Sequence, residues 1–246
     1  MNLISALADI IYPPRCPICK EFLHKGRSIR DGDPLSFCPT CTADFRPITS
    51  PLCPICGTLF SSTLEEDHPC EDCLRKRPFY EAAWAPYRYE GAILNAIHQL
   101  KYGAKSFLAD FLGPRLARFT ENRFKVPGPL LTMPVPLHPK RLRERGFNQS
   151  LLLARHVAKG LQIDLDFLSL RRIRYTMPQT SLAKKKRQEN VRGAFQLKRP
   201  EAVRGKTILL VDDVATTGNT LNECAVALKR AGSKKIYCVT LARAVR

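Results

Sequence analysis

The apolar positions of the chain predict a parallel α/β domain in its larger, C-terminal part. The unbroken apolar run Ile208–Val211 predicts a strand buried on both faces, as in parallel sheets. Further core strands are expected within residues 82–89, 130–137 and 235–242. Apolar residues at helical spacing predict helices over 92–100, 107–119, 147–161 and 219–230. The strand at 208–211 is therefore expected to belong to a parallel sheet.

The N-terminal part of the chain has a different pattern. Apolar residues between Leu3 and Ile11 predict a short amphipathic helix, which Pro13 and Pro14 end. Paired cysteines then replace regular periodicity as far as a linker at residues 75–78. We therefore expect an N-terminal helix and cysteine-rich module at residues 1–78, and the α/β domain at residues 79–246. A chain of 246 residues, 44% of them hydrophobic, can bury one full core and a small appendage.

Eight of the ten cysteines form four Cys-x-x-Cys pairs: Cys16 and Cys19, Cys38 and Cys41, Cys53 and Cys56, and Cys70 and Cys73. Eight thiols within about sixty residues fit a double zinc ribbon with two structural Zn²⁺ sites of four cysteines each. Disulfides are disfavoured in a reducing compartment. Four thioredoxin-like motifs would need βαβ units that this part of the pattern lacks. Consecutive pairing gives loops of ordinary length, but the sequence leaves open which pairs share a metal. Cys224 and Cys238 lie within predicted core elements and are expected to be packing residues.

The compartment is inferred from what the sequence lacks. The first residues have no basic group ahead of their apolar core, and Asp9 interrupts that core, so a signal peptide is not expected. No apolar run approaches the length of a membrane span. The expected location is therefore cytoplasmic.

Basic residues are concentrated in one segment of the chain. The formal net charge is +18, and residues 138–206 contain 18 basic and 5 acidic residues, a net of +13. A merely solvated surface would spread its charge, so this concentration indicates a polyanionic ligand. Nucleic acid and a diphosphate group both fit that description.

The polar residues that follow the predicted strand at 208–211 suit a phosphorylated ligand. Asp212 and Asp213 come first, then a short turn that contains Gly218, then a helix. A strand, a small-residue loop and a helix N-terminus direct several backbone N–H groups to one point, which favours an anion. The alternative is an ordinary strand-to-helix turn, but two acids at a buried strand end would then be costly.

This stretch resembles the loop that binds 5-phosphoribosyl-1-pyrophosphate (PRPP) in type I phosphoribosyltransferases. The resemblance implies a type I phosphoribosyltransferase-like fold, a Rossmann-like parallel sheet flanked by helices, for residues 79–246. The resemblance implies that Asp212 and Asp213 hold the ribose hydroxyls, that the loop cradles the 5′-phosphate, and that Mg²⁺ accompanies PRPP. The implied PRPP-binding residues are Asp212, Asp213, Val214, Ala215, Thr216, Thr217, Gly218, Asn219 and Thr220.

Residues 138–146 are predicted to form a basic loop between the first core strand and the helix at 147–161. Type I phosphoribosyltransferases hold pyrophosphate at this position, which makes Lys140 and Arg141 the candidates for that role. The candidate nucleic-acid contacts are Arg143, Arg145, Lys184, Lys185, Lys186 and Arg187. The alternative for the loop is a solvated basic surface. For the run at 184–187, sequence alone does not separate a diphosphate clamp from a DNA contact.

The order of the motifs along the chain resembles the ComF (competence protein F) family. The cysteine module is followed by His-Gln-Leu-Lys-Tyr-Gly at 98–103, by Pro-Val-Pro-Leu-His-Pro-Lys-Arg-Leu-Arg-Glu-Arg-Gly-Phe-Asn-Gln at 134–149, and by the PRPP-like loop. The resemblance implies a cytoplasmic role in natural transformation or DNA uptake. It implies single-stranded DNA and a phosphorylated ribose as ligands, with other competence proteins, such as a helicase or a recombination mediator, as partners.

Three hypotheses about activity follow. Purine-salvage enzymes of this fold carry a further acid where Thr216 stands, and a threonine cannot act as that base. We therefore favour a DNA-uptake factor that binds PRPP or a 5′-phosphorylated nucleotide and single-stranded DNA. The second hypothesis is an active phosphoribosyltransferase with an unknown acceptor. The third is a zinc-ribbon interaction module with a vestigial site.

Overall fold

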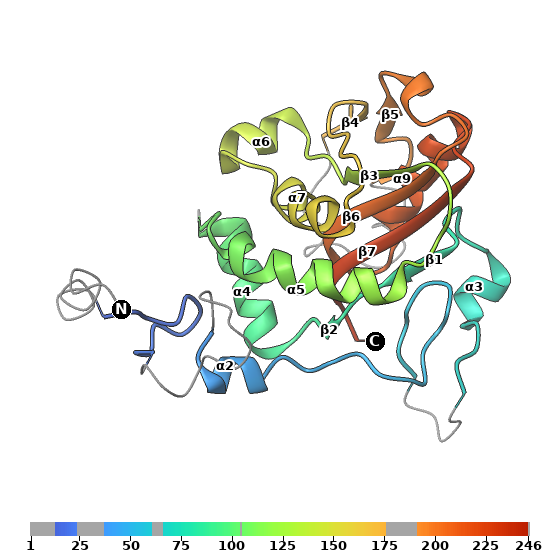
Figure 1. Cartoon of the computed structure of the whole chain (residues 1–246). Coiled ribbons are helices and arrows are strands. Elements are labelled where there is room, and N and C mark those ends of the chain that lie inside the picture. The colour runs from blue at the N-terminus through green and yellow to red at the C-terminus, as the bar shows by residue number, and fades with distance from the viewer. Residues whose placement is uncertain (1–12, 24–36, 61–65, 104, 176–190, 246) are drawn as a thin grey trace.

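A computed structural model of the chain describes residues 13–23, 37–60, 66–103, 105–175 and 191–245 (Figure 1). The cysteine-rich part contains two short helices, α2 (Pro39–Ala43) and α3 (Glu71–Arg75). The strands are β1 (Ala82–Trp84), β2 (Tyr87–Arg88), β3 (Leu130–Pro134), β4 (Leu170–Arg172), β5 (Phe195–Leu197), β6 (Thr207–Ala215) and β7 (Lys235–Arg243). The longer helices are α4 (Gly91–Tyr102), α5 (Leu108–Arg123), α6 (Pro139–Arg145), α7 (Gln149–Leu161) and α9 (Asn219–Arg230), and η2 (Pro200–Ala202) is a 3₁₀ turn.

The central sheet is parallel, with the strand order β1-β7-β6-β3. The short strand β2 also pairs with β7 in parallel, while β4 and β5 form a separate antiparallel pair. This confirms the predicted parallel sheet and its core strands at 130–137, 208–211 and 235–242. The expected strand at 82–89 is two strands, because Ala85 and Pro86 separate β1 from β2.

Alternate residues of β6 and β7 point to opposite faces of the sheet, as the period of a strand requires. Leu209, Val211, Val239 and Leu241 join the core that α4, α5 and α7 cover. Their neighbours in the two strands, including Ile208 and Leu210, join the core beneath α9. All of these side chains are fully buried, which explains why the sequence shows an unbroken apolar run there.

The cysteine-rich part packs against the sheet domain at two places. Phe37 and Phe45 belong to the same buried cluster as α4 and α5, and Ile55 belongs to the cluster beneath α9. Figure 1 shows α2 and α3 on different sides of the molecule. The division at residue 78 remains a prediction about domain organisation.

One local prediction is wrong. Residues 139–145 form the helix α6 and not a loop. His138 caps the start of this helix by accepting a bond from the Lys140 backbone N–H, Pro139 occupies the first turn, and Gly146 ends it with φ of 82°. Proline at the first turn and glycine just after the last are helix signals. The run of basic residues between them obscured the signals.

The other structural predictions concerned the two unpaired cysteines, the N-terminal helix and membrane spans. Cys224 and Cys238 are fully buried core residues, as predicted. The helix expected near residues 3–11 lies outside the described residues. Among the residues that the structure describes, none of the helices has the length and apolar character that a membrane span requires.

Candidate functional site

The two acids that follow the buried strand lie at the carboxyl end of β6 and are almost fully buried. Asp212 is 8% exposed and Asp213 is 3% exposed. The Ser150 hydroxyl, near the start of α7, donates a hydrogen bond to Asp212 Oδ1 over 2.7 Å. The backbone N–H of Asp213 donates to the same oxygen over 2.9 Å. Strand β6 and the N-terminus of α7 therefore fix the orientation of the Asp212 carboxylate.

A lysine from a distant part of the chain supplies a positive charge beside Asp212 and Asp213, which we call the acid pair. Lys101, near the end of α4, places its Nζ 2.5 Å from Asp213 Oδ2, and its side chain is only 18% exposed. Burial lowers the pKa of Lys101, but the two carboxylates act in the other direction and the pKa is raised overall. The lysine therefore stays protonated beside Asp213.

The pKa of Asp212 is raised to about 7, first by burial and second by repulsion from Asp213. The bond from Ser150 and the charge of Lys101 act against this shift without cancelling it. Asp213 thus forms an ion pair with Lys101, whereas the carboxyl group of Asp212 titrates near neutrality.

The acid pair opens into a cavity of about 460 Å³ at the carboxyl end of the sheet. Six of the nine predicted PRPP-binding residues line it: Asp212, Asp213, Val214, Thr216, Thr217 and Thr220. Ala215 is buried in the sheet instead. Gly218 and Asn219 line a second cavity, of about 420 Å³, which Cys56 and Cys73 also line. Thr217 lines both cavities, so the loop forms the wall between them.

The loop itself has the geometry that its sequence suggests. Gly218 has φ of 77° and stands immediately before α9. A Cβ at this position would meet the Tyr80 hydroxyl at 3.1 Å, in addition to the strain of the left-handed backbone. Three threonines of the loop and of the first turn of α9, Thr216, Thr217 and Thr220, line the cavity beside the N-terminus of α9, a suitable arrangement for a phosphate group.

Basic residues reach the same cavity from α6 and β4. Of the predicted pyrophosphate and nucleic-acid contacts, Arg141 and Arg145 line it. Arg145 donates from Nη1 to Gln149 Oε1 over 2.5 Å, and its guanidinium lies over the Tyr102 ring. Arg172 also lines the cavity, although the sequence offered no motif that would identify it.

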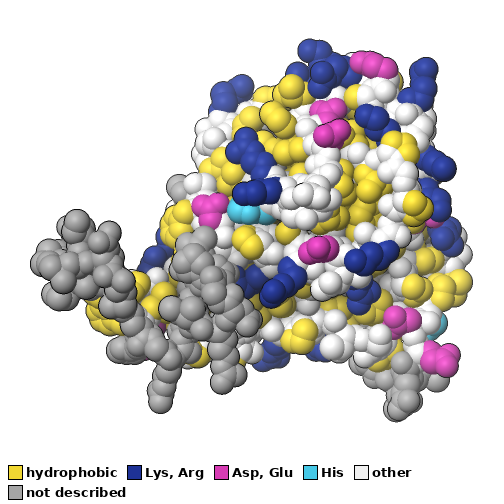
Figure 2. All heavy atoms as spheres, viewed as in Figure 1, with side chains coloured by type: hydrophobic (Ala, Val, Ile, Leu, Met, Phe, Trp, Pro, Cys, Tyr) yellow, Lys and Arg dark blue, Asp and Glu magenta, His cyan; other side chains and the backbone are white. Residues whose placement is uncertain are grey.

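The remaining predicted basic contacts lie elsewhere. Lys140 does not line the cavity, and its ammonium lies 4.8 Å from the centre of the Tyr175 ring. Arg143 is exposed on α6. Lys184, Lys185, Lys186 and Arg187 lie outside the described residues. Basic side chains are also visible along the upper edge of the molecule, over the segments that contain α6, β4 and β5 (Figure 2).

Two residues that contact the acid pair, Lys101 and Ser150, had no ligand-binding role assigned from the sequence. Lys101 lies within the motif at 98–103, and Ser150 directly follows the motif at 134–149. These two motifs carried part of the resemblance to the ComF family, but they did not single out Lys101 or Ser150. Only the three-dimensional packing of α4 and α7 shows that both residues meet the acid pair.

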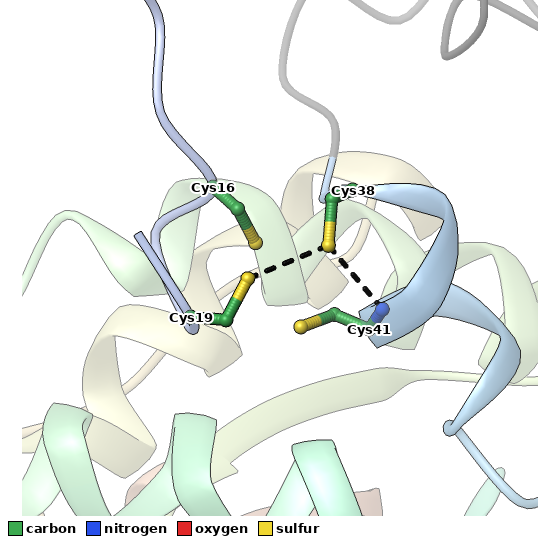
Figure 3. A group of neighbouring side chains, drawn as sticks. All are labelled: Cys16, Cys19, Cys38 and Cys41. Carbon is green, nitrogen blue, oxygen red and sulfur yellow. Dashed lines mark hydrogen bonds between the residues drawn. The ribbon is translucent and has the colours of Figure 1, made fainter. Parts of the chain in front are cut away.

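The eight paired cysteines form two groups, each made of consecutive pairs. Cys16, Cys19, Cys38 and Cys41 form one group, and Cys53, Cys56, Cys70 and Cys73 form the other. Within each group the sulfur atoms lie within 4.8 Å of one another. Figure 3 shows the four side chains of the first group converging, with Cys19 Sγ 3.5 Å from Cys38 Sγ. This resolves the pairing that the sequence left open.

Four converging thiols fit tetrahedral Zn²⁺, whose Zn–S bonds of about 2.3 Å place sulfur atoms roughly 3.8 Å apart. The second group has a further feature that fits a metal. Arg243 is buried beside it, and its Nε and Nη1 have no hydrogen-bond partner, while Nη2 donates to Thr58 Oγ1 over 2.8 Å. Burial raises the pKa of Cys56, but the charge of Arg243 and hydrogen bonds with Thr58 and Cys73 together outweigh it and bring the pKa to about 7. A buried cation beside four sulfurs suits a zinc–thiolate group with a net negative charge.

The acid pair is a poorer match for Mg²⁺. This ion prefers six oxygen ligands in near-octahedral geometry and keeps several waters. Here one carboxylate oxygen is already in contact with an ammonium group. Within the described residues, the groups of three or more potential metal ligands are the two cysteine groups. The protein side chains at the acid pair therefore do not make a dedicated Mg²⁺ site.

Comparison with known proteins agrees with this architecture. The double zinc ribbon domain matches residues 7–74 and the phosphoribosyl transferase domain matches residues 148–245. The chain is 31% identical over 234 residues to the DNA utilization protein YhgH of Escherichia coli (strain K12). This match covers 94% of the chain and 97% of that relative. It is 29% identical over 238 residues to Competence protein F of Haemophilus influenzae, and the match covers 94% of this chain and 97% of that relative. The chain belongs to the ComF family.

A third ComF relative is Competence protein ComFC of Streptococcus pneumoniae, which is 30% identical over 219 residues and covers 86% of this chain and 89% of the relative. Membership of the ComF family confirms the predicted fold class, a type I phosphoribosyltransferase-like domain with an N-terminal double zinc ribbon. The matched phosphoribosyl transferase segment begins just before α7 and includes the acid pair, the loop and α9.

Proposed function

We propose that this ComF-family protein binds a phosphorylated ribose, either PRPP or a 5′-phosphorylated nucleotide, in the cavity beside Asp212 and Asp213. The observation that supports this most directly is the composition of that single cavity. Buried carboxylates that can accept hydrogen bonds from ribose hydroxyls, threonines of the loop and three arginines all line it. With PRPP, the Mg²⁺ would travel with the diphosphate group, and Arg141 and Arg145 would add positive charge there.

Calorimetric titration of PRPP into the full chain tests this proposal. The expected result is saturable binding that is at least tenfold weaker in the variant Thr217→Val, which removes a hydroxyl from the shared wall. Thr40→Val, an exposed position on α2, is the matched control. A titration with no heat at any concentration would contradict the proposal and favour a vestigial site.

We further propose that the protein binds single-stranded DNA and acts on the cytoplasmic side in natural transformation or DNA uptake, with other competence proteins as partners. The names of its relatives and the net charge of +13 over residues 138–206 support this role. Electrostatic binding to nucleic acid weakens linearly with the logarithm of salt concentration, with a slope of about −0.7 per contacted phosphate for single strands.

The salt dependence gives a direct test of the DNA-binding run. Replacement of Lys184, Lys185, Lys186 and Arg187 by alanine should weaken binding of a fluorescent oligonucleotide and flatten its salt slope by about 2 to 3. The control replaces four exposed basic residues from outside the basic segment 138–206: Lys125, Arg230, Lys234 and Lys235. Equal slopes in the two variants would assign the DNA contact to another segment.

A second candidate function is an active, Mg²⁺-dependent phosphoribosyltransferase with an unknown acceptor. The arginines that line the acid-pair cavity favour it, because they could neutralise charge on a diphosphate leaving group. Thr216 argues against a base-assisted reaction, so the acceptor would be an amine that is already nucleophilic. Release of pyrophosphate from PRPP in the presence of ammonia or simple amines would support this function. No release above the rate without protein would exclude these acceptors.

A further inference from the structure

Lys101 forms an ion pair with Asp213 inside the cavity, and its charge affects which ligands can bind there. The inference rests on the proposed binding of a phosphorylated ribose. Asp212 and Asp213 are buried side by side, so two full negative charges there would repel each other and lack solvation. Lys101 Nζ lies 2.5 Å from Asp213 Oδ2 and lines the same cavity. The ammonium group thus stands where a positive charge is most needed.

The position of Lys101 is set by a firmly held helix. At the start of α4, the backbone N–H of Ala92 donates to Asp44 Oδ2 over 2.7 Å. Near its end, the Gln99 side-chain amide donates to the Ile18 carbonyl oxygen over 3.1 Å. Both acceptors belong to the first cysteine-rich segment. The first cysteine-rich segment therefore contacts α4 at both ends and fixes the position of Lys101 beside the acid pair.

A divalent cation would compete with this lysine. Mg²⁺ bound at the acid pair would compete with Lys101 for Asp213 Oδ2 and would be repelled by the ammonium group already there. Other cationic residues, Arg145 and Arg172, also line the cavity and disfavour a further cation. An ammonium group, in contrast, leaves the remaining carboxylate oxygens able to accept hydroxyl groups.

We propose that Lys101 is the resident cation of the acid pair, and that the protein binds the ribose end of its ligand without a divalent ion. Sugar phosphates and nucleoside 5′-monophosphates, which have a single phosphate and no diphosphate, would then be full ligands of this cavity. Lys101 determines this specificity, because it balances the carboxylates that grip the ribose.

Ribose 5-phosphate is the probe that separates the ribose end from the diphosphate. Calorimetric titrations are made on the zinc-loaded full chain, either with Mg²⁺ or in metal-free buffer treated with a resin that leaves structural zinc in place. For the wild-type chain we expect dissociation constants that agree within about twofold. A dissociation constant that improves tenfold or more with Mg²⁺ would overturn the proposal.

Variants of Lys101 give a second test. Lys101→Met should weaken metal-free binding of ribose 5-phosphate by at least about tenfold, and Mg²⁺ should restore part of that loss. Lys101→Arg should retain binding without Mg²⁺, since it keeps a charge. Lys125→Met, an exposed lysine, is the matched control. Unchanged binding by Lys101→Met would overturn the proposal, and the comparison of the wild-type chain with and without Mg²⁺ decides the question if that variant does not fold.

Failure of the proposed function gives a different pattern of results. If neither ribose 5-phosphate nor PRPP binds under any condition, the cavity does not hold phosphorylated ribose at all. If both bind but only with Mg²⁺, the proposed function holds and the role of Lys101 is rejected.

Discussion

The neighbourhood of Asp212 makes the stability of the protein depend on pH. Its carboxyl has an ordinary pKa of 3.8 in an open environment and about 7 in the fold. The folded state therefore holds its proton more tightly than the unfolded state. As the pH rises from about 4 to about 7, ionisation favours the unfolded chain, and above about 7 this effect is complete. Asp212 thus lowers the free energy of unfolding as the pH rises.

Asp212→Asn should remove this dependence. Between about pH 5.5 and pH 8, wild-type stability should fall by roughly 2 kcal/mol more than that of the variant. Urea unfolding of both proteins at the two pH values measures the difference, and this range avoids acid release of zinc. Asp164→Asn, at an exposed position, should follow the wild-type curve. A parallel pH dependence for Asp212→Asn and the wild-type chain would contradict the raised pKa.

Gly218 offers a second test at the residue scale. Gly218→Ala should cost about 1 to 2 kcal/mol of backbone strain and should also weaken PRPP binding, because its methyl group would press on Tyr80 behind the loop. Gly205→Ala is the matched control, since Gly205 has φ of 71° but open space around it. Denaturation should show similar losses of stability in the two variants. Calorimetry should show weaker PRPP binding only in Gly218→Ala.

At the scale of elements, α4 shows how the cysteine-rich part reaches the site. Its N-cap residue, Glu90, provides no side-chain cap, and Asp44 from the ribbon takes that role instead. Asp44→Ala should therefore destabilise the chain by about 1 kcal/mol, whereas Asp44→Asn keeps an acceptor oxygen and should cost less. Thermal unfolding of the two variants tests this order. The reverse order would mean that the contact with α4 is not a helix cap.

The last strand, β7, has a corresponding link to the second cysteine group. Arg243→Met keeps the packing volume of Arg243 but removes its charge, so the zinc–thiolate group beside it should lose its buried counter-ion. A colorimetric chelator should then extract one zinc per chain faster than from the wild type. The first group is an internal control, because its zinc should leave at an unchanged rate. Two zinc ions released at wild-type rates would contradict the role of Arg243.

Elements with a strong local signal were predictable from the sequence, and elements fixed by distant contacts were not. The run Ile208–Val211 is fully buried by both layers of helices, so composition alone indicated its strand. α6 was missed because its helix signals surround a stretch with no buried residue. The acid pair and its loop were recognisable because they are contiguous. Lys101 and Ser150 were not assigned, because they come from 111 and 62 residues away from Asp212 along the chain.

At the scale of the whole molecule, the two cysteine groups hold elements on different sides of the acid pair. The first contacts α4, which carries Lys101, and the second contacts Arg243, next to the cavity-lining residue Ala244. The aromatic residues Phe37 and Phe45 lie in the same core as α4 and α5. We therefore expect zinc to stabilise the sheet domain as well as the cysteine-rich part.

Removal of zinc should consequently affect the whole chain. Calorimetric unfolding should show one cooperative transition for the zinc-loaded protein, shifted down by several degrees after treatment with a strong chelator. Re-addition of Zn²⁺ before heating is the control and should restore the original temperature. A transition of the sheet domain that stays at the same temperature without zinc would show that the ribbons fold independently of it.

The strand order of the sheet has a consequence for biosynthesis. β7 is made after every other strand, yet it lies between β1 and β6. Until β7 leaves the ribosome, β1 has no partner in the sheet and one edge of β6 is unpaired. The eight metal-binding cysteines, in contrast, all emerge within the first 73 residues. Metal capture can therefore precede closure of the sheet during translation, and the nascent chain would need a chaperone most in the interval between the two events.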